Sequence, residues 1–333
     1  MHTRFSLWHG AIGGILVGSL ILFVVVNWNS EGQPFSRADS AIRAEQSIER
    51  PGQPSTVLAG ALAPRPVSLE SVGAFQIELP NLQTANGRHL LALYRAGIDP
   101  KATLEQKYLA MQVIMACNGY ANPRILTRQR AVALSQLPAD SPKRAIMEER
   151  LDVLADRCSP LEEVGQSTWR ASTERLSRDL AAPDSLFAPV QLNNQDGSPA
   201  TEVELTQARQ EARAALETYG PVALNWVSNS LFALAQAVKD QPGRLDYGLD
   251  AGVAKSAAVA AAILPCVAGQ PCGSDSLNVL SLCVGSGGVE CEDSLEASMF
   301  EYLPDDASRA RAKAIASDIV SAVAARDWAR LGL

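Results

Sequence analysis

Apolar residues follow two different patterns along this chain. Residues 11–28 read AIGGILVGSLILFVVVNW and contain no charged side chain, an apolar run near the length of a membrane-crossing helix. From residue 84 onward, apolar positions instead recur every three or four residues, which is the spacing of one helix face. No convincing two-residue alternation occurs outside residues 74–80, where we predict a short extended segment. The pattern as a whole predicts an all-α protein.

The apolar run is predicted to be an uncleaved signal anchor. Trp8 and Trp28 flank it, as aromatic residues at membrane interfaces often do. Arg4 carries the positive charge on the short side, which places residues 1–10 in the cytoplasm and the bulk of the chain in the periplasm. A cleaved signal peptide is the alternative, but bulky residues stand where small ones should precede cleavage. We therefore expect a single-pass protein of the inner membrane.

Three further segments are predicted beyond the anchor. Residues 29–75 are rich in Ser, Pro, Gly and Gln, a composition typical of a flexible linker. Residues 76–182 and 200–333 are predicted to form two helical subdomains, separated by a break that contains Pro, Asn and Gly. We expect the helices to pack as an antiparallel helix-hairpin bundle, or as a degenerate helical-repeat array, stapled by disulfides.

Apolar stripes and end signals locate the helices. Stripes in the first subdomain run along residues 104–117 and 140–158, and the sequence TEVE at 201–204 is a capping-box signature in the second. The other predicted helices cover 89–97, 123–137 and a stretch from 160 in the first subdomain, and 202–219, a stretch from 221, 245–264 and 305–328 in the second.

Cys117 and Cys158 are predicted to form a disulfide. They end the helices at 104–117 and 140–158, and the three helices from 104 to 158 should run up, down and up because their connections are short. Both cysteines therefore lie at the same end of the bundle. The bond would close about 40 residues and stabilise the fold by about 3–4 kcal/mol.

The other four cysteines lie in residues 264–292, LPCVAGQPCGSDSLNVLSLCVGSGGVECE, called the four-Cys segment below. Its spacing lacks the close ligand pairs of structural zinc sites and the C-x-x-C of thioredoxin-like redox sites. Cysteines beyond an export signal indicate disulfides, and we predict the pairs Cys266–Cys272 and Cys283–Cys291. The nested pairing, Cys266–Cys291 with Cys272–Cys283, is the alternative.

Composition and charge narrow the classes of function. The net charge is −7 and no cluster of Lys and Arg is apparent, which disfavours nucleic acid as a partner. Of three histidines only His89 lies beyond the anchor, too few for a histidine-rich metal site. The sequence GSGGVEC has no strand before it and no Lys, so it does not predict a phosphate-binding loop. We therefore predict no metal and no cofactor.

Two features of the sequence bear on catalysis. His89 would have to serve any Ser-His-Asp or Cys-His site, but it lies in an amphipathic helix and is expected at the surface. The stretch ESVGAFQIELP resembles the G-x-M-Q-x-x-P stretch of lytic transglycosylases, through Gly73, Phe75, Gln76 and Pro80. In that family the catalytic acid lies on an upstream helix, whereas here the predicted linker stands upstream. No catalytic residue is therefore predicted.

The four-Cys segment and the closing ARDWARLGL resemble the C-terminal part of exported helical proteins of Gram-negative bacteria. Asp327, Trp328 and Leu331 match their D-W-x-x-L end. The resemblance covers roughly the last 70 residues and implies an exported, disulfide-bonded helical protein, without an activity. We expect a membrane-anchored periplasmic binding or scaffold module whose partner is an envelope protein. The alternatives are an envelope hydrolase with a single carboxylate acid, and a thiol-redox or zinc protein.

Overall fold

The computed structural model describes residues 68–118, 120–135, 137–182, 184–188, 201–236, 251–285 and 291–333. The described residues are helical apart from turns and one isolated bridge between Gly273 and Ser294, which confirms the predicted all-α class. The predicted cytoplasmic N-terminus, the anchor at 11–28 and the linker as far as residue 67 lie outside these residues. Within the described part of the chain, no helix combines the length and hydrophobicity needed to cross a bilayer.

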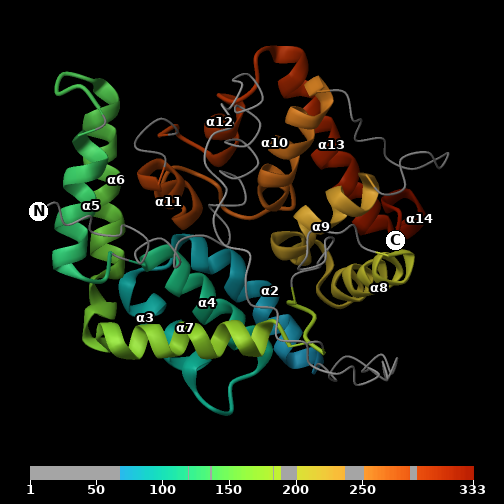
Figure 1. The fold of residues 1–333 in the computed structure, drawn as a ribbon, viewed down its shortest axis with the longest axis horizontal. Helices are drawn as coiled ribbons and strands as arrows, with labels where there is room; N and C mark the ends of the chain where they lie inside the picture. Colours follow the sequence, from blue (N-terminus) through green and yellow to red (C-terminus); the bar gives the residue numbers. More distant parts are fainter. Residues whose placement is uncertain are drawn as a thin grey trace, which may run out of the picture.

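The helices form two groups (Figure 1). The first comprises α2 (Leu69–Thr84), α3 (Gly87–Ile98), α4 (Leu104–Cys117), α5 (Pro123–Ser135), α6 (Pro142–Cys158), the 3-10 helix η2 (Ser159–Val164) and α7 (Gln166–Leu180). The second comprises α8 (Glu202–Tyr219), the 3-10 helix η3 (Gly220–Ala223), α9 (Leu224–Gln236), α10 (Ala251–Val267), α11 (Leu277–Gly285), α12 (Leu295–Phe300), α13 (Asp306–Ala325) and α14 (Trp328–Leu331).

Helix α2 connects its own group to the second one, because it packs against α4 of the first group and against α8 and α11 of the second. It begins at Leu69, where the Ser68 side chain caps it, so the predicted linker is wrong over residues 69–75. The prediction of an extended segment at 74–80 is wrong as well, because all of these residues, Pro80 included, lie inside this helix. The buried side chains of α2 recur with helical spacing and enter the core: Val72, Phe75, Leu79 and Leu82.

Several helix contacts join elements that are not neighbours along the chain. In repeat arrays each unit contacts only its neighbours along the chain. Here consecutive helices pair in α3 with α4 and in α5 with α6, but α4 also packs on α7, α6 on α11 and α10 on α13. The buried apolar residues of both groups join in a single core. The two predicted subdomains therefore share their interior.

Small residues allow the closest helix contacts. Helices α10 and α13 pack on each other, and both carry buried alanines: Ala257, Ala260, Ala312 and Ala316. Between α3 and α4 the small residue is Gly97, which is buried. A Cβ atom added at Gly97 would lie 2.3 Å from both the Gln106 carbonyl oxygen and the Ala110 Cβ. Only a residue without a side chain fits at this crossing.

Replacing Gly97 by alanine is therefore expected to lower the free energy of unfolding by about 1–3 kcal/mol, the usual cost of overpacking a core. Gly73→Ala is the matched control, because nothing lies within 4 Å of a Cβ added there. In the middle of α2 that change should instead raise stability by up to about 1 kcal/mol. Urea denaturation of both variants measures the difference. A neutral Gly97→Ala would mean that α3 and α4 do not cross as closely as described.

Two local breaks refine the predicted helices. The helix predicted from residue 160 begins as the 3-10 turn η2, and Gly165, with φ of 73°, turns the chain into α7. The last predicted helix ends at Ala325, because Arg326 adopts the left-handed conformation. Asp327 then caps α14, so that Trp328 and Leu331 enter the core. The D-W-x-x-L end thus consists of one helix cap and two core residues.

Candidate functional site

The six cysteines form the three disulfides predicted from the sequence. The Cα–Cα distances are 5.4 Å for Cys117–Cys158, 5.6 Å for Cys266–Cys272 and 4.4 Å for Cys283–Cys291. The alternative nested pairing is wrong. No cysteine is left unpaired, and no group of three metal-ligating side chains occurs among the described residues. Since zinc binds cysteine as the thiolate, the bonded sulfurs are not available as zinc ligands.

The four-Cys segment is held against helix α6 by three basic side chains spaced by seven residues, Lys143, Arg150 and Arg157. Seven residues are about two helical turns, so the three share one face. Lys143 lies 3.8 Å from the Glu292 carboxylate. Arg150 donates to the Ser274 carbonyl oxygen and lies 3.7 Å from the Asp293 carboxylate. Arg157 donates a hydrogen bond of 2.6 Å to the Asp275 carbonyl oxygen. This basic row docks the four-Cys segment onto the first group of helices.

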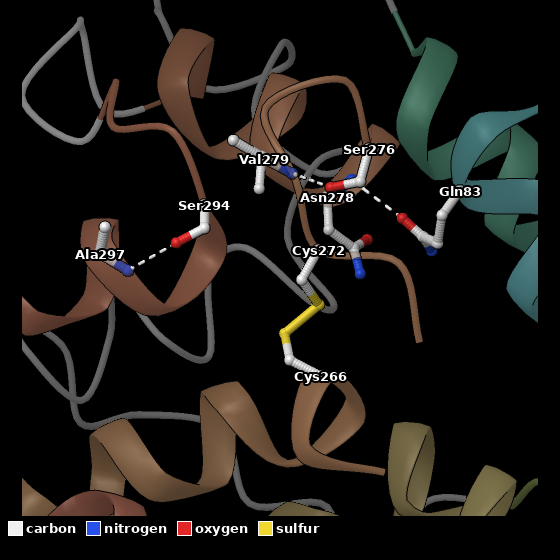
Figure 2. The surroundings of a disulfide bond; sticks show 8 residues. All are labelled: Gln83, Cys266, Cys272, Ser276, Asn278, Val279, Ser294 and Ala297. Atoms are coloured by element: carbon white, nitrogen blue, oxygen red, sulfur yellow. Dashed lines mark hydrogen bonds between the residues drawn. A yellow bond between two sulfur atoms is a disulfide. The ribbon is translucent and has the colours of Figure 1, made fainter. Parts of the chain in front are cut away.

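A buried amide completes the docking. Gln83, at the end of α2, is 5% exposed, and its side-chain oxygen accepts a hydrogen bond of 3.1 Å from the Asn278 backbone N–H (Figure 2). The backbone carbonyl oxygen of Gln83 accepts a hydrogen bond of 3.3 Å from the Arg157 side chain, which also donates to the Asp275 carbonyl oxygen. In the same segment Ser276 caps α11 by accepting a bond from the Val279 N–H. The side chains of Gln83 and Arg157 therefore fix backbone groups that lie 195 and 118 positions further along the chain.

The second polar feature of the interior is the Glu105 carboxylate, which is 5% exposed. Its Oε1 atom accepts a hydrogen bond from the Tyr219 hydroxyl at 2.9 Å, and it lies 3.2 Å from the Ser71 hydroxyl, whose one proton is shared with the Ser68 carbonyl oxygen at 2.9 Å. Glu105 lies in the first turn of α4, whose N-terminal dipole favours a negative charge. The network joins α2 and α4 to the end of α8. It satisfies a carboxylate that would be costly to bury alone.

Five aromatic side chains surround this network: Phe75, Tyr108, Phe187, Tyr219 and Trp226. The ring centroids of neighbours lie 4.7–6.0 Å apart, the range of favourable aromatic pairs. Burial raises the pKa of Tyr108. Burial also raises the pKa of Tyr219, and the charge of Glu105 and the hydrogen bond donated to it raise that pKa further. Both tyrosines are therefore held in their protonated form.

Tyr219→Phe is expected to lower the free energy of unfolding by about 1.5–3 kcal/mol, because the buried carboxylate loses a hydrogen-bond donor. Tyr108→Phe is the matched control in the same cluster, since burial alone acts on its hydroxyl and no hydrogen bond to it occurs within the described part of the chain. That change should shift stability by less than about 1 kcal/mol. Chemical denaturation of the two variants provides the comparison. Equal losses would show that the Glu105 network contributes nothing beyond packing.

His89 and Gln76 each contact a structural partner. The His89 Nε2 atom lies 3.0 Å from the Glu78 carboxylate, and both side chains are 36% exposed. Gln76 donates a hydrogen bond of 3.2 Å to the Tyr219 carbonyl oxygen, so it serves packing between α2 and α8. The GSGG part of the four-Cys segment lies largely outside the described residues.

A basic helix face is a feature that the sequence analysis missed. Helix α5 contains three arginines and no acidic residue, and it packs mainly on α6 at the edge of the molecule (Figure 1). Arg130 pairs with Asp152, whereas Arg124 and Arg128 are exposed and their side chains contact no acid among the described residues. Val132, one turn further on, is 53% exposed. The signal in the sequence is PRILTRQR, which has three arginines within eight residues.

No family model, curated protein or solved structure matches this chain. The assignment of a function therefore depends on the geometry described above.

Proposed function

We propose that the protein is an exported helical scaffold module, anchored in the inner membrane through residues 11–28, with its disulfide-bonded domain in the periplasm. The observation that carries the proposal is that all six cysteines are paired. Such bonds form and persist in oxidising compartments and are rare in the cytosol. The uncharged run at 11–28 supplies the export signal, and the Ser- and Pro-containing segment after it supplies the tether.

The polar groups in the interior of the protein agree better with a binding role than with hydrolysis. A carboxylate acid of an envelope hydrolase must reach its substrate, whereas Glu105 is 5% exposed and its Oε1 already accepts a hydrogen bond from the Tyr219 hydroxyl. The half-exposed His89 pairs with Glu78 and sits in no triad with a serine or cysteine among the described residues. Glu105 and His89 therefore both have structural partners that account for their positions.

The binding surface that we propose is the exposed face of α5, formed by Arg124, Arg128 and Val132. Arginine binds carboxylates through two parallel hydrogen bonds, and two arginines one turn apart can engage neighbouring carboxylates. Val132 adds an apolar contact beside them. The partner that fits this face is an envelope protein with an acidic surface.

The topology is tested with a reporter enzyme that is active only outside the cytosol, fused after Leu333 through a flexible linker. Activity is expected for the full chain and should disappear when residues 11–28 are deleted. Activity of a second kind of reporter, one that works only inside the cytosol, would overturn the export and the periplasmic location together.

The binding face is tested by crosslinking partners to the full chain in isolated envelopes. The charge-reversed pair Arg124→Glu and Arg128→Glu should lose capture of an acidic protein, and high salt should weaken capture by the unaltered chain. The matched control is Arg88→Glu with Lys255→Glu, two exposed cations elsewhere on the surface. Equal capture by both double variants would exclude α5 as the binding face. Turnover of purified peptidoglycan that is lost in Glu105→Gln would establish the hydrolase alternative instead.

A further inference from the structure

The three disulfides differ in their access to solvent. Both sulfurs of Cys117–Cys158 are fully buried, and Cys283 and Cys291 are 0% and 4% exposed. Cys266 and Cys272 are only partly buried, at the rim of the core. Access of an attacking thiolate is one of the factors that set the rate of thiol–disulfide exchange. Cys266–Cys272 is therefore the bond that a reductant reaches first.

The position of this bond determines which parts of the fold would separate when it opens. Cys266 lies in the last turn of α10, which packs on α13 in the second group of helices. Cys272 begins the loop whose next residues are held by Gln83 and the basic row of α6 in the first group. Figure 2 shows the bond joining the end of α10 to this loop. The disulfide thus ties one group of helices to a loop docked on the other.

We propose that Cys266–Cys272 is a site of reversible thiol–disulfide exchange with a dithiol reductant. One thiolate of the dithiol attacks either sulfur and forms a mixed disulfide, while the other protein sulfur leaves as a thiolate and takes a proton from water. The second thiol of the dithiol then attacks the mixed disulfide. The protein gains two electrons and two protons as a pair of thiols, and the dithiol becomes a disulfide.

Reduction lengthens the joint between the two groups. In the disulfide the Cα atoms are 5.6 Å apart, whereas six extended peptide steps can span about 20 Å. The loop is also held by the Leu295 N–H, which donates to the Cys272 carbonyl oxygen at 3.0 Å, and by the bridge between Gly273 and Ser294. Once the bond is open, this region is held by these two contacts, by the turn bonds that Gly269 and Gln270 donate to the end of α10, and by the packing of α10 on α12.

The test is graded reduction of the native full chain in detergent, followed by alkylation and peptide mapping. Cys266 and Cys272 are expected to be alkylated at least about tenfold faster than the other four cysteines. In denaturant the three bonds should open at similar rates, which shows that the fold confers the selectivity. Earlier opening of a buried bond, or simultaneous opening of all three in the native chain, would overturn the proposal.

Hydrogen exchange of the selectively reduced protein provides the second readout. Amide exchange should become at least about tenfold faster at residues 267–276 and 291–295 while α4 stays protected, because the joint loosens without global unfolding. Removal of the reductant under oxidising conditions should restore the original exchange. The Cys266→Ser and Cys272→Ser double variant should exchange like the reduced protein. Unchanged exchange in both forms would contradict the role of the bond as a joint.

Discussion

Raising the pH from 10 to 12 is expected to remove about 5 kcal/mol from the free energy of unfolding through two tyrosines alone. Tyr108 and Tyr219 are 7% and 1% exposed, and burial raises the pKa of both above the value of about 10 in an unfolded chain. Above pH 10 the unfolded state loses these protons while the folded state retains them. Their contribution is therefore complete below pH 10 and falls by about 1.4 kcal/mol per pH unit for each tyrosine.

Urea denaturation at a series of alkaline pH values measures this loss, and the tyrosinate absorbance reports ionisation directly. The double variant Tyr108→Phe and Tyr219→Phe starts with lower stability but should have a shallower decline above pH 10. Tyr120, whose pKa burial raises to about 12, remains in both proteins and provides an internal reference. Parallel declines of the variant and the unaltered chain would show that other groups control alkaline unfolding.

Replacing Cys117 and Cys158 together by alanine is expected to lower the free energy of unfolding by about 4 kcal/mol. The bond joins residues 41 positions apart, and a cross-link restricts the unfolded chain more strongly as the closed loop grows. Denaturation without reductant gives the value. The same replacement of Cys266 and Cys272, only six positions apart, should cost about 2.5 kcal/mol.

The order of these two losses is the informative quantity, because alanine removes a similar volume at each site. A larger loss for the Cys266 and Cys272 pair would contradict loop entropy as the dominant contribution. It would indicate instead that the joint between the two groups of helices supports the native packing directly.

The sequence located most helices of both groups because their apolar stripes and caps are local signals. The capping box of Thr201 and Glu204 forms both of its expected bonds. The Cys117–Cys158 pair followed from short connections, which fix the direction of successive helices. These inferences succeed because each requires only neighbouring residues along the chain.

The features that escaped sequence analysis depend on distant contacts or on conflicting local signals. Glu105 and Tyr219 are 114 positions apart, and no local sequence pattern around either residue indicates that the two are in contact. In α2, Gly73 and Pro80 weaken the helical pattern, and packing against three other helices overrides that local preference. The arginines of α5 could have been noticed from composition, but only the structure shows that, among the described residues, Arg124 and Arg128 contact no acid.

The central place of α2 decides where a shortened chain for crystallisation can begin. A chain starting at residue 76 would lose Val72 and Phe75 from the shared interior, together with the Ser71 hydroxyl beside Glu105. Ser68 must be kept too, since its side chain accepts a bond from the Ser71 N–H and caps the helix. A fragment that omits the proposed anchor should therefore start no later than Ser68.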